Sequence, residues 1–279
     1  MMNYLMDYHI HSNHSTDAIS SITEVCQSAI NRGISEIAIT DHFEPSNGDE
    51  LYEVYNQKSY WADIAKAKQL YKGKLKVKMG VELGQPHIFG IGSGIVMQDF
   101  PYDYVIASAH KLPDGRDMSE IDYLSMTVDD VCEMYLKQIK NLLDWKNFDC
   151  VGHIDLIKRY SASIYGKNLS LTCQYELLTQ VLKKIIESGK GFEINTSGLR
   201  QLPKETMPGL DVLDLYHKLG GEILTIGSDA HHAEDVGKGI NEAIILAQKS
   251  GFRFITSFNK RKPVQIKISD EKAFSIGQW

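Results

Sequence analysis

The sequence predicts an α/β barrel formed by a single domain of residues 1–279. Two observations lead to this prediction. Short apolar runs alternate with longer amphipathic segments, which is typical of βα units and of a mainly parallel sheet. Seven or eight such units follow one another without a Pro-, Gly- or Ser-rich linker, and this number favours a closed barrel over an open sheet.

The first three units are marked by apolar runs and by residues typical of helix boundaries. Ser21 and Glu24 form a capping box at the start of the first helix, and Gly33 ends it. The elements predicted here are strands at residues 4–9, 35–40 and 76–83 and helices at residues 21–32 and 58–71.

The alternation continues through the rest of the chain. The clearest helix spans residues 127–145, where apolar side chains recur at spacings of three and four. The other predicted elements are strands at 104–108, 148–152, 191–195 and 222–227, helices at 171–188, 211–219 and 238–250, and late strand-like runs at 252–257 and 264–268. The polar segments 48–53 and 113–125 are candidate rim loops.

Charge and hydropathy limit the classes of partner. The formal net charge is -6, from 30 basic and 36 acidic residues, so a general attraction to nucleic acid or to anionic membranes is not expected. The N-terminus lacks the pattern of a signal peptide, and no apolar run approaches the roughly 20 residues of a membrane span. We expect a cytoplasmic protein with a small-molecule ligand; no pattern indicates an oligomeric state.

Side chains that bind metals recur where the predicted strands end. Active sites of α/β barrels lie at this mouth, and alternation along the first strand sends both imidazoles of the first motif to one side. The strand-end residues include six of the ten histidines and are His9, His11, His42, Glu82, His110, His153, Asp229 and His231. Imidazoles with a few carboxylates are typical donors to Zn²⁺, Mn²⁺ or Fe, and the set exceeds the needs of one ion. The sequence therefore predicts a multinuclear metal site.

These motifs also resemble those of a known family. They are HIHSNHSTDA, ITDH, GVELG, SAH, GHID, EINTSG and GSDAHH, which look like the motifs of the PHP family, named for polymerase and histidinol phosphatase. The segment EINTSGLR is similar to the histidinol-phosphatase branch in particular. The resemblance covers Asp7 to about Gly237 and implies a distorted (β/α)7 barrel with three metal ions.

The resemblance also implies which residues hold each ion. The first ion would have His9, His11, Glu82 and Asp229; the second would share Glu82 and add His110 and His153; the third would have Asp17, His42 and His231. Asp17 takes a position where many members of the family have histidine. Two adjacent ions would acidify a bridging water to hydroxide, which attacks the phosphate. Asp229 would orient or deprotonate that water, and Glu82 and His42 would act through the ions they hold.

The implied reaction is hydrolysis of L-histidinol phosphate to L-histidinol and phosphate, a step of histidine biosynthesis. Arg159 and Arg200 follow the fifth and sixth strands, where a guanidinium is placed to bind the phosphate, and Glu120 in a rim loop is placed to face a substrate ammonium group.

Three alternatives remain open from the sequence. Another phosphoesterase of the same family would act on nucleotides or other small phosphate esters. Amidohydrolases also carry a histidine pair on a first barrel strand, but Glu82 on the third strand argues against that class. The last alternative is a metal-binding protein without catalysis.

Overall fold

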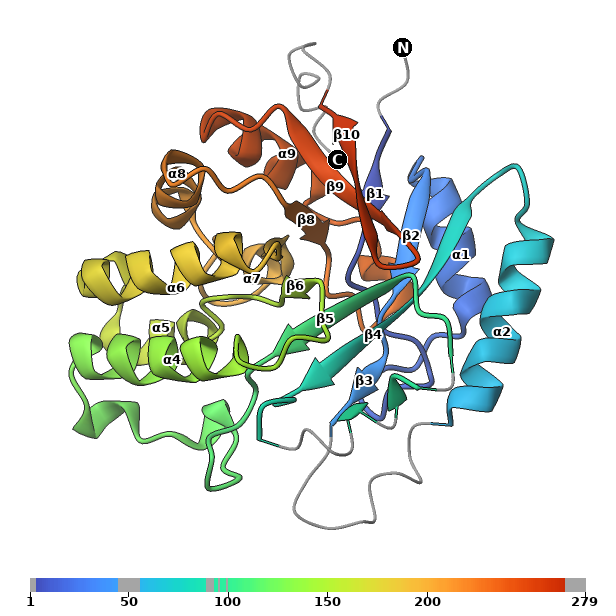
Figure 1. The fold of residues 1–279 in the computed structure, drawn as a ribbon. Coiled ribbons are helices and arrows are strands. Elements are labelled where there is room, and N and C mark those ends of the chain that lie inside the picture. The colour runs from blue at the N-terminus through green and yellow to red at the C-terminus, as the bar shows by residue number, and fades with distance from the viewer. Residues whose placement is uncertain (1–3, 45–55, 89–92, 95, 99, 269–279) are drawn as a thin grey trace.

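Seven parallel strands form a nearly closed barrel in the computed structural model, which describes residues 4–44, 56–88, 93–94, 96–98 and 100–268 (Figure 1). Their order around the barrel is β1-β2-β4-β5-β6-β7-β8. The strands are β1 (Met6–Asp7), β2 (Glu36–Ile39), β4 (Lys76–Gly84), β5 (Tyr104–Ser108), β6 (Cys150–Val151), β7 (Gly191–Asn195) and β8 (Leu224–Gly227). The predicted rim loop at residues 48–53 lies outside the described residues.

Backbone hydrogen bonds join the first and last strands. The N–H of Tyr8 donates to the carbonyl of Ile226 (2.8 Å), and beyond the strand ends the N–H of Asp229 donates to the carbonyl of His9 (2.7 Å). Ile10 forms a parallel bridge with Ala230. The predicted (β/α)7 barrel is thereby confirmed.

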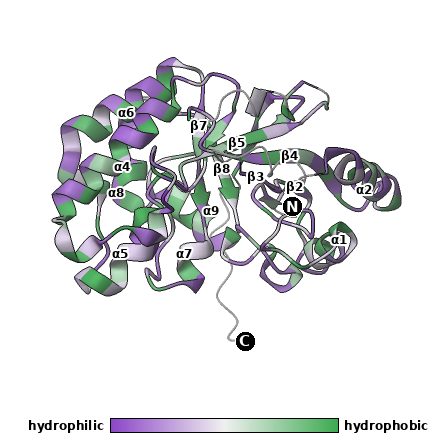
Figure 2. Cartoon of the chain, turned by 90° about the horizontal axis from the view of Figure 1, so that it is seen from below, coloured by the Kyte–Doolittle hydropathy of each residue, from purple (hydrophilic) through white to green (hydrophobic). Residues whose placement is uncertain are grey.

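Helices surround the strands, as Figure 2 shows from below. They are α1 (Ile22–Asn31), α2 (Gln57–Leu70), α4 (Val128–Leu142), α5 (Ile157–Tyr165), α6 (Tyr175–Glu187), α7 (Ser197–Arg200), α8 (Leu210–Lys218) and α9 (Ile240–Lys249). Because helices cover the outside and side chains fill the inside, the short strands are buried along almost their whole length. None of the helices in the described part of the chain is both long and apolar enough to span a membrane.

Three short elements are absent from the sequence prediction. The strand β3 (His42–Phe43) pairs with β4 in the same register as β2 does, so that His42 lies opposite Glu82. The helix α5 has no capping side chain at its start, and α7 is a single turn, so neither carries a strong sequence signal. The predicted helix at 171–188 is divided into a 3-10 turn, η4 (Leu171–Gln174), and α6.

The two late strand-like runs pair with each other rather than with the barrel. They form an antiparallel hairpin of β9 (Phe254–Asn259) and β10 (Lys262–Lys267). Its contacts reach the N-terminal ends of barrel strands: Ser257 donates to Glu36, the first residue of β2 (2.6 Å), and the N–H of Arg261 donates to the carbonyl of Asp103, directly before β5 (2.9 Å). The hairpin therefore covers the N-terminal end of the barrel and leaves the opposite end for the site (Figure 1).

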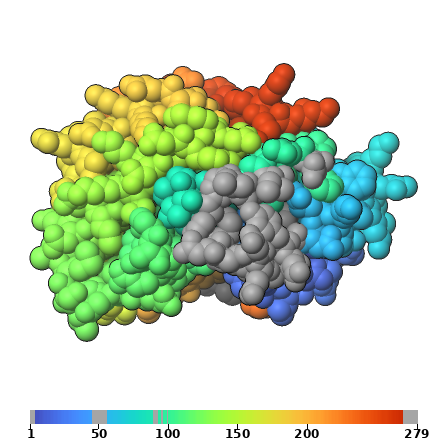
Figure 3. Space-filling model, turned by 60° about the horizontal axis from the view of Figure 1, so that its bottom comes forward, coloured from blue at the N-terminus to red at the C-terminus, as the bar shows by residue number. Residues whose placement is uncertain are grey.

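The rim of that opposite end includes the predicted rim loop at residues 113–125. This segment holds two 3-10 turns, η2 (Met118–Glu120) and η3 (Tyr123–Ser125), and Figure 3 shows it in green on the surface. Asp117 caps the first turn and forms a capping box with Glu120.

Candidate metal centre

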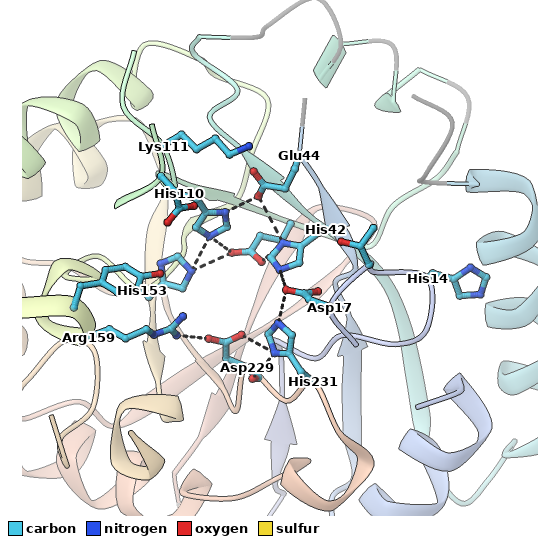
Figure 4. A pocket seen from close by; sticks show the side chains of 14 residues that line it. His14, Asp17, His42, Glu44, His110, Lys111, His153, Arg159, Asp229 and His231 are labelled. Atoms are coloured by element: carbon cyan, nitrogen blue, oxygen red, sulfur yellow. Dashed lines mark hydrogen bonds and ion pairs between the residues drawn. The ribbon is translucent and has the colours of Figure 1, made fainter. Parts of the chain in front are cut away.

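The side chains predicted at the strand ends meet around one pocket of about 250 Å³ (Figure 4). Its lining combines imidazoles, carboxylates and two cationic side chains. The residues that line it are His14, Thr16, Asp17, His42, Glu44, Glu82, His110, Lys111, Asp117, His153, Arg159, Tyr160, Asp229 and His231. His9 and His11 are fully buried beneath this lining.

The imidazole of His9 is held by a carboxylate that is absent from the sequence prediction. His9 Nδ1 lies 2.9 Å from both oxygens of Glu193, and His9 Nε2 lies 3.0 Å from His11 Nε2. Glu193 is fully buried in the middle of β7, where an apolar side chain is usual. A charged residue inside a predicted core strand is the sequence feature by which Glu193 could have been recognised as part of the site. A proton on Nδ1 directed at Glu193 leaves Nε2 as the electron-pair donor toward the pocket.

Close packing in the barrel gives His9 its place. A side-chain atom on Gly227 of the neighbouring strand would overlap His9 Cβ, so only glycine is compatible with this arrangement. The sequence Gly227-Ser228-Asp229 therefore supplies both the space for one ligand and, two residues later, another carboxylate.

Glu82 lies at the centre of the cluster. Its Oε2 is 3.1 Å from His9 Nε2 and 3.1 Å from His42 Nδ1, and its Oε1 is 3.2 Å from His153 Nε2. Burial alone would raise the pKa of Glu82, but the positive charge of His9, His42 and His110 holds it well below its usual value. Glu82 is therefore a carboxylate anion shared by imidazoles from four strand ends.

His42, His231 and Asp17 form a second group beside His11. The rings of His42 and His231 lie 4.2 and 4.3 Å from the ring of His11. Asp17 Oδ2 lies 3.2 Å from His231 Nε2 and 3.5 Å from His42 Nε2, and this carboxylate is half exposed. Burial and the neighbouring imidazoles hold the pKa of His11 well below its usual value, so His11 is a neutral donor.

Asp229 divides its two oxygens between the imidazoles and an arginine. Its backbone adopts a left-handed conformation (φ 53°), which aspartate tolerates better than most residues. Oδ1 faces His11 Nε2 at 3.4 Å, and Oδ2 accepts a hydrogen bond from Arg159 at 2.8 Å. Burial alone would raise the pKa of Asp229, but His9, His11 and Arg159 hold it well below its usual value.

His110 lies across the cluster and has its own carboxylate partner, Glu44, which the sequence prediction does not include. His110 Nε2 lies 3.1 Å from His153 Nε2 and 3.3 Å from Glu82 Oε1, whereas His110 Nδ1 lies 2.5 Å from Glu44 Oε1. Glu44 follows the two-residue strand β3, and that strand carries no sequence signal.

The donors fit transition-metal ions. Three groups have potential ligand atoms within 4.8 Å of one another: His9, His11 and Glu82; His42, Glu82 and His110; and His11, His42 and His231. Several electron-pair donors face each other at about 3 Å, among them His9 Nε2 and Glu82 Oε2. A proton or a metal ion can lie between such partners, and imidazole with carboxylate is the donor set of Zn²⁺, Mn²⁺ or Fe.

The three residues predicted to bind substrate differ in their position relative to the pocket. Arg159 lines the pocket. Arg200 is not among the lining residues: its Nη2 donates to the carbonyl of Ser228 (2.8 Å), because the single turn of α7 directs it to the back of the loop that carries Asp229. Glu120 is exposed and accepts from the N–H of Asp117 (3.0 Å), so Asp117 lies at the pocket in its place. Lys111, directly after His110, is a second lining cation.

Comparisons with known proteins agree with this geometry. A family model described as "PHP domain" matches residues 7–197. A histidinol-phosphatase from Lactococcus lactis is 30% identical over 263 residues, covering 92% of this chain and 95% of the relative. A protein from Thermotoga maritima named probable histidinol-phosphatase is 26% identical over 95% of this chain and 100% of its own length.

A solved structure shares the fold. It is the histidinol phosphate phosphatase of Lactococcus lactis complexed with zinc, L-histidinol and phosphate. It superimposes with a TM-score of 0.80 at 26% identity, covering 93% of this chain and 98% of that one.

Proposed function

Because the chain belongs to the PHP domain family, we propose that it is a metal-dependent phosphatase that hydrolyses L-histidinol phosphate to L-histidinol and phosphate. The observation that carries the proposal is the meeting of imidazoles and carboxylates from successive strand ends around one pocket. The Lactococcus lactis enzyme, which has the same fold, binds zinc, L-histidinol and phosphate. In this proposal residues 1–279 act as one domain, in the cytoplasm, in histidine biosynthesis.

The proposed centre holds three divalent ions of zinc, manganese or iron. Glu82 would contribute to two of the ion sites, because its two oxygens face different imidazoles. The assignments are His9, His11, Glu82 and Asp229 for the first ion, Glu82, His110 and His153 for the second, and Asp17, His42 and His231 for the third. When bound, such ions supply Lewis acidity toward phosphoryl oxygens and lower the pKa of water at the site.

Asp229 orients the attacking water. A carboxylate whose pKa lies well below its usual value is a weak base, so accepting a hydrogen bond from water is its expected role. The bond that forms joins the water oxygen to phosphorus, and the bond that breaks joins phosphorus to the histidinol oxygen. The histidinol oxygen leaves with a proton, and the products are an alcohol and inorganic phosphate.

Arg159 and Lys111 supply the positive charge for the phosphate group. Arg159 uses Nη2 on Asp229 and Ser197, which leaves other N–H groups of the guanidinium for an anion in the pocket. Lys111 has no ion pair within the described residues, although it lines a pocket rich in carboxylates. Asp117, at the same rim, is placed to receive the ammonium group of the substrate.

Activity measured against a panel of compounds tests the proposal. The purified protein, with its metal content measured, should hydrolyse histidinol phosphate faster than nucleotides, other phosphomonoesters, diesters or amides. A chelator should abolish this activity, and Zn²⁺, Mn²⁺ or Fe²⁺ should restore it. A preference for nucleotides would assign the chain to another phosphoesterase activity of the family, and chelator-resistant activity would overturn the metal-dependent mechanism.

A further inference from the structure

The carboxylate of Glu44 lies in a site shaped for it at the rim of the cluster. In Figure 4 it lies between His110 and His42, with interactions drawn to both. Oε1 is 2.5 Å from His110 Nδ1 and 3.6 Å from His42 Nδ1. A side-chain atom on Gly84, in β4, would overlap the carboxylate, so glycine is required for Glu44 to reach this position.

Gln85 fixes the orientation of this carboxylate. The amide oxygen of the fully buried Gln85 accepts from the backbone N–H groups of His110 (2.6 Å) and Lys111 (3.1 Å). The amide nitrogen must then face the other way, where it donates to Glu44 Oε2 (2.9 Å). Both oxygens of Glu44 are therefore acceptors with defined donors.

The contact with Glu44 also determines which nitrogen of His110 carries the proton. A hydrogen on Nδ1 is donated to Glu44, which leaves Nε2 as an electron-pair donor toward Glu82 and His153. His9 and Glu193 have the same arrangement on the other side of the cluster. His153 differs, because its Nδ1 has no hydrogen-bond partner in the part of the chain that the structure describes.

We propose that Glu44 is a positioning residue that fixes the ring and the tautomer of His110, so that the ion shared by Glu82, His110 and His153 binds only weakly without it. This inference rests on the metal centre of the proposed function, but not on the identity of the substrate. Outer carboxylates of this kind typically contribute about 10- to 100-fold to metal affinity.

Glu44→Gln gives a sharp test because the amide cannot satisfy both neighbours. If its oxygen faces His110, its NH2 group opposes the NH2 group of Gln85. If its NH2 group faces His110, Nδ1 must accept, and the proton moves to Nε2, the atom needed for the metal. The first orientation repels the NH2 group of Gln85 and so displaces the side chain, and the second opposes the tautomer that binds metal, although the side chain keeps its size.

The experiment measures zinc content in buffers of defined free Zn²⁺, together with the zinc dependence of histidinol phosphate hydrolysis. Glu44→Gln should retain one ion fewer per chain than the wild type at limiting Zn²⁺, and should need about 10- to 100-fold more zinc for full occupancy. Gly84→Ala should have the same phenotype, because it displaces Glu44. Glu133→Gln, an exposed change on α4, is the matched control and should equal the wild type.

A double variant separates positioning from direct coordination. If Glu44 acts through His110, His110→Ala and His110→Ala with Glu44→Gln should lose the same single ion. A second ion lost in the double variant would overturn the inference, as would wild-type zinc content and titration in folded Glu44→Gln. Circular dichroism and Tm establish folding for each variant. A wild-type protein that binds zinc but does not hydrolyse histidinol phosphate would refute the proposed substrate alone, because the zinc content still decides the role of Glu44.

Discussion

Arg159 donates a hydrogen bond to Asp229 Oδ2 at 2.8 Å, while Oδ1 of the same carboxylate faces His11 at 3.4 Å. The carboxylate of Asp229 thus lies between the imidazoles and a cation that lines the pocket. A change at either residue will alter the other.

The first prediction concerns this coupling. Arg159→Ala should lower kcat/KM by about 10- to 150-fold, which corresponds to the roughly 1.5–3 kcal/mol of a charge-assisted hydrogen bond. Asp229→Asn should lower kcat, and kcat/KM with it, by about 10²-fold, because the amide no longer orients the attacking water. The double variant should lose less than the product of these factors, because each single change already breaks the pair. Kinetics on histidinol phosphate test this, and independent, multiplicative losses would contradict it.

The second prediction distinguishes the cations near the pocket. Lys111→Ala and Arg159→Ala should each weaken inhibition by inorganic phosphate, because both side chains line the pocket. Arg200→Ala should leave that inhibition nearly unchanged and should instead lower Tm, since Arg200 holds the carbonyl of Ser228. If phosphate inhibition weakens in Arg200→Ala but persists in Lys111→Ala, the assignment of the two cations must be exchanged.

The third prediction compares two proposed ligands. Glu82→Ala should reduce both metal content and kcat more than Asp17→Ala. Glu82 is fully buried and contacts imidazoles from several strand ends, whereas Asp17 is half exposed and contacts two. Elemental analysis and steady-state kinetics on both variants provide the comparison, and a Glu82→Ala protein with normal metal content would show that no ion is shared there.

The fourth prediction concerns protons released on metal binding. In the protein without metal, burial alone would lower the pKa of His42, but Glu82 and Asp17 raise it to about 10. At pH 7.5 His42 is therefore protonated and must lose its proton to become a ligand. Metal affinity should fall as the pH is lowered from 10, because protons compete increasingly for this imidazole.

Calorimetry can measure this release. Titrations of Zn²⁺ into metal-free protein at pH 7.5, in two buffers with different ionisation enthalpies, should give different heats that report at least one proton released per chain. The exposed variant His232→Ala should release the same number. Equal heats in both buffers would contradict the prediction.

The proposed ligands lie where strands end, and the ends of the strands can be predicted from the sequence. His9, Glu82 and His110 each follow an apolar run, and parallel strands must end at one mouth of a barrel. The structure accordingly brings these residues to a single cluster. The length of a strand is harder to predict from the sequence than the place where it ends. Residues 4–9 were predicted as strand, but the strand that pairs with β2 covers only Met6–Asp7. The residues that follow form backbone hydrogen bonds with residues across the barrel seam.

Directions of side chains on short helices and loops were not predictable in the same way. Arg200 follows the sixth predicted strand, but a single helical turn decides whether it faces the pocket or the loop behind it. Glu44 depends on a two-residue strand whose pairing is set by β4, far along the chain. Glu120 is turned away by a local capping box with Asp117. In each case packing against a distant or local partner outweighs position in the sequence.

The closure of the barrel seam has a consequence for the biosynthesis of the protein. His9 and Asp229 are joined through their backbones, although they lie 229 − 9 = 220 residues apart. At about 5–20 residues per second, a ribosome takes roughly 10–45 s to travel from one to the other. During this interval the first histidines have been made but their partner carboxylate has not, so a complete centre cannot form on the nascent chain. The proposed first ion therefore cannot gain its full set of ligands until Asp229 has been synthesised, late in the translation of the chain.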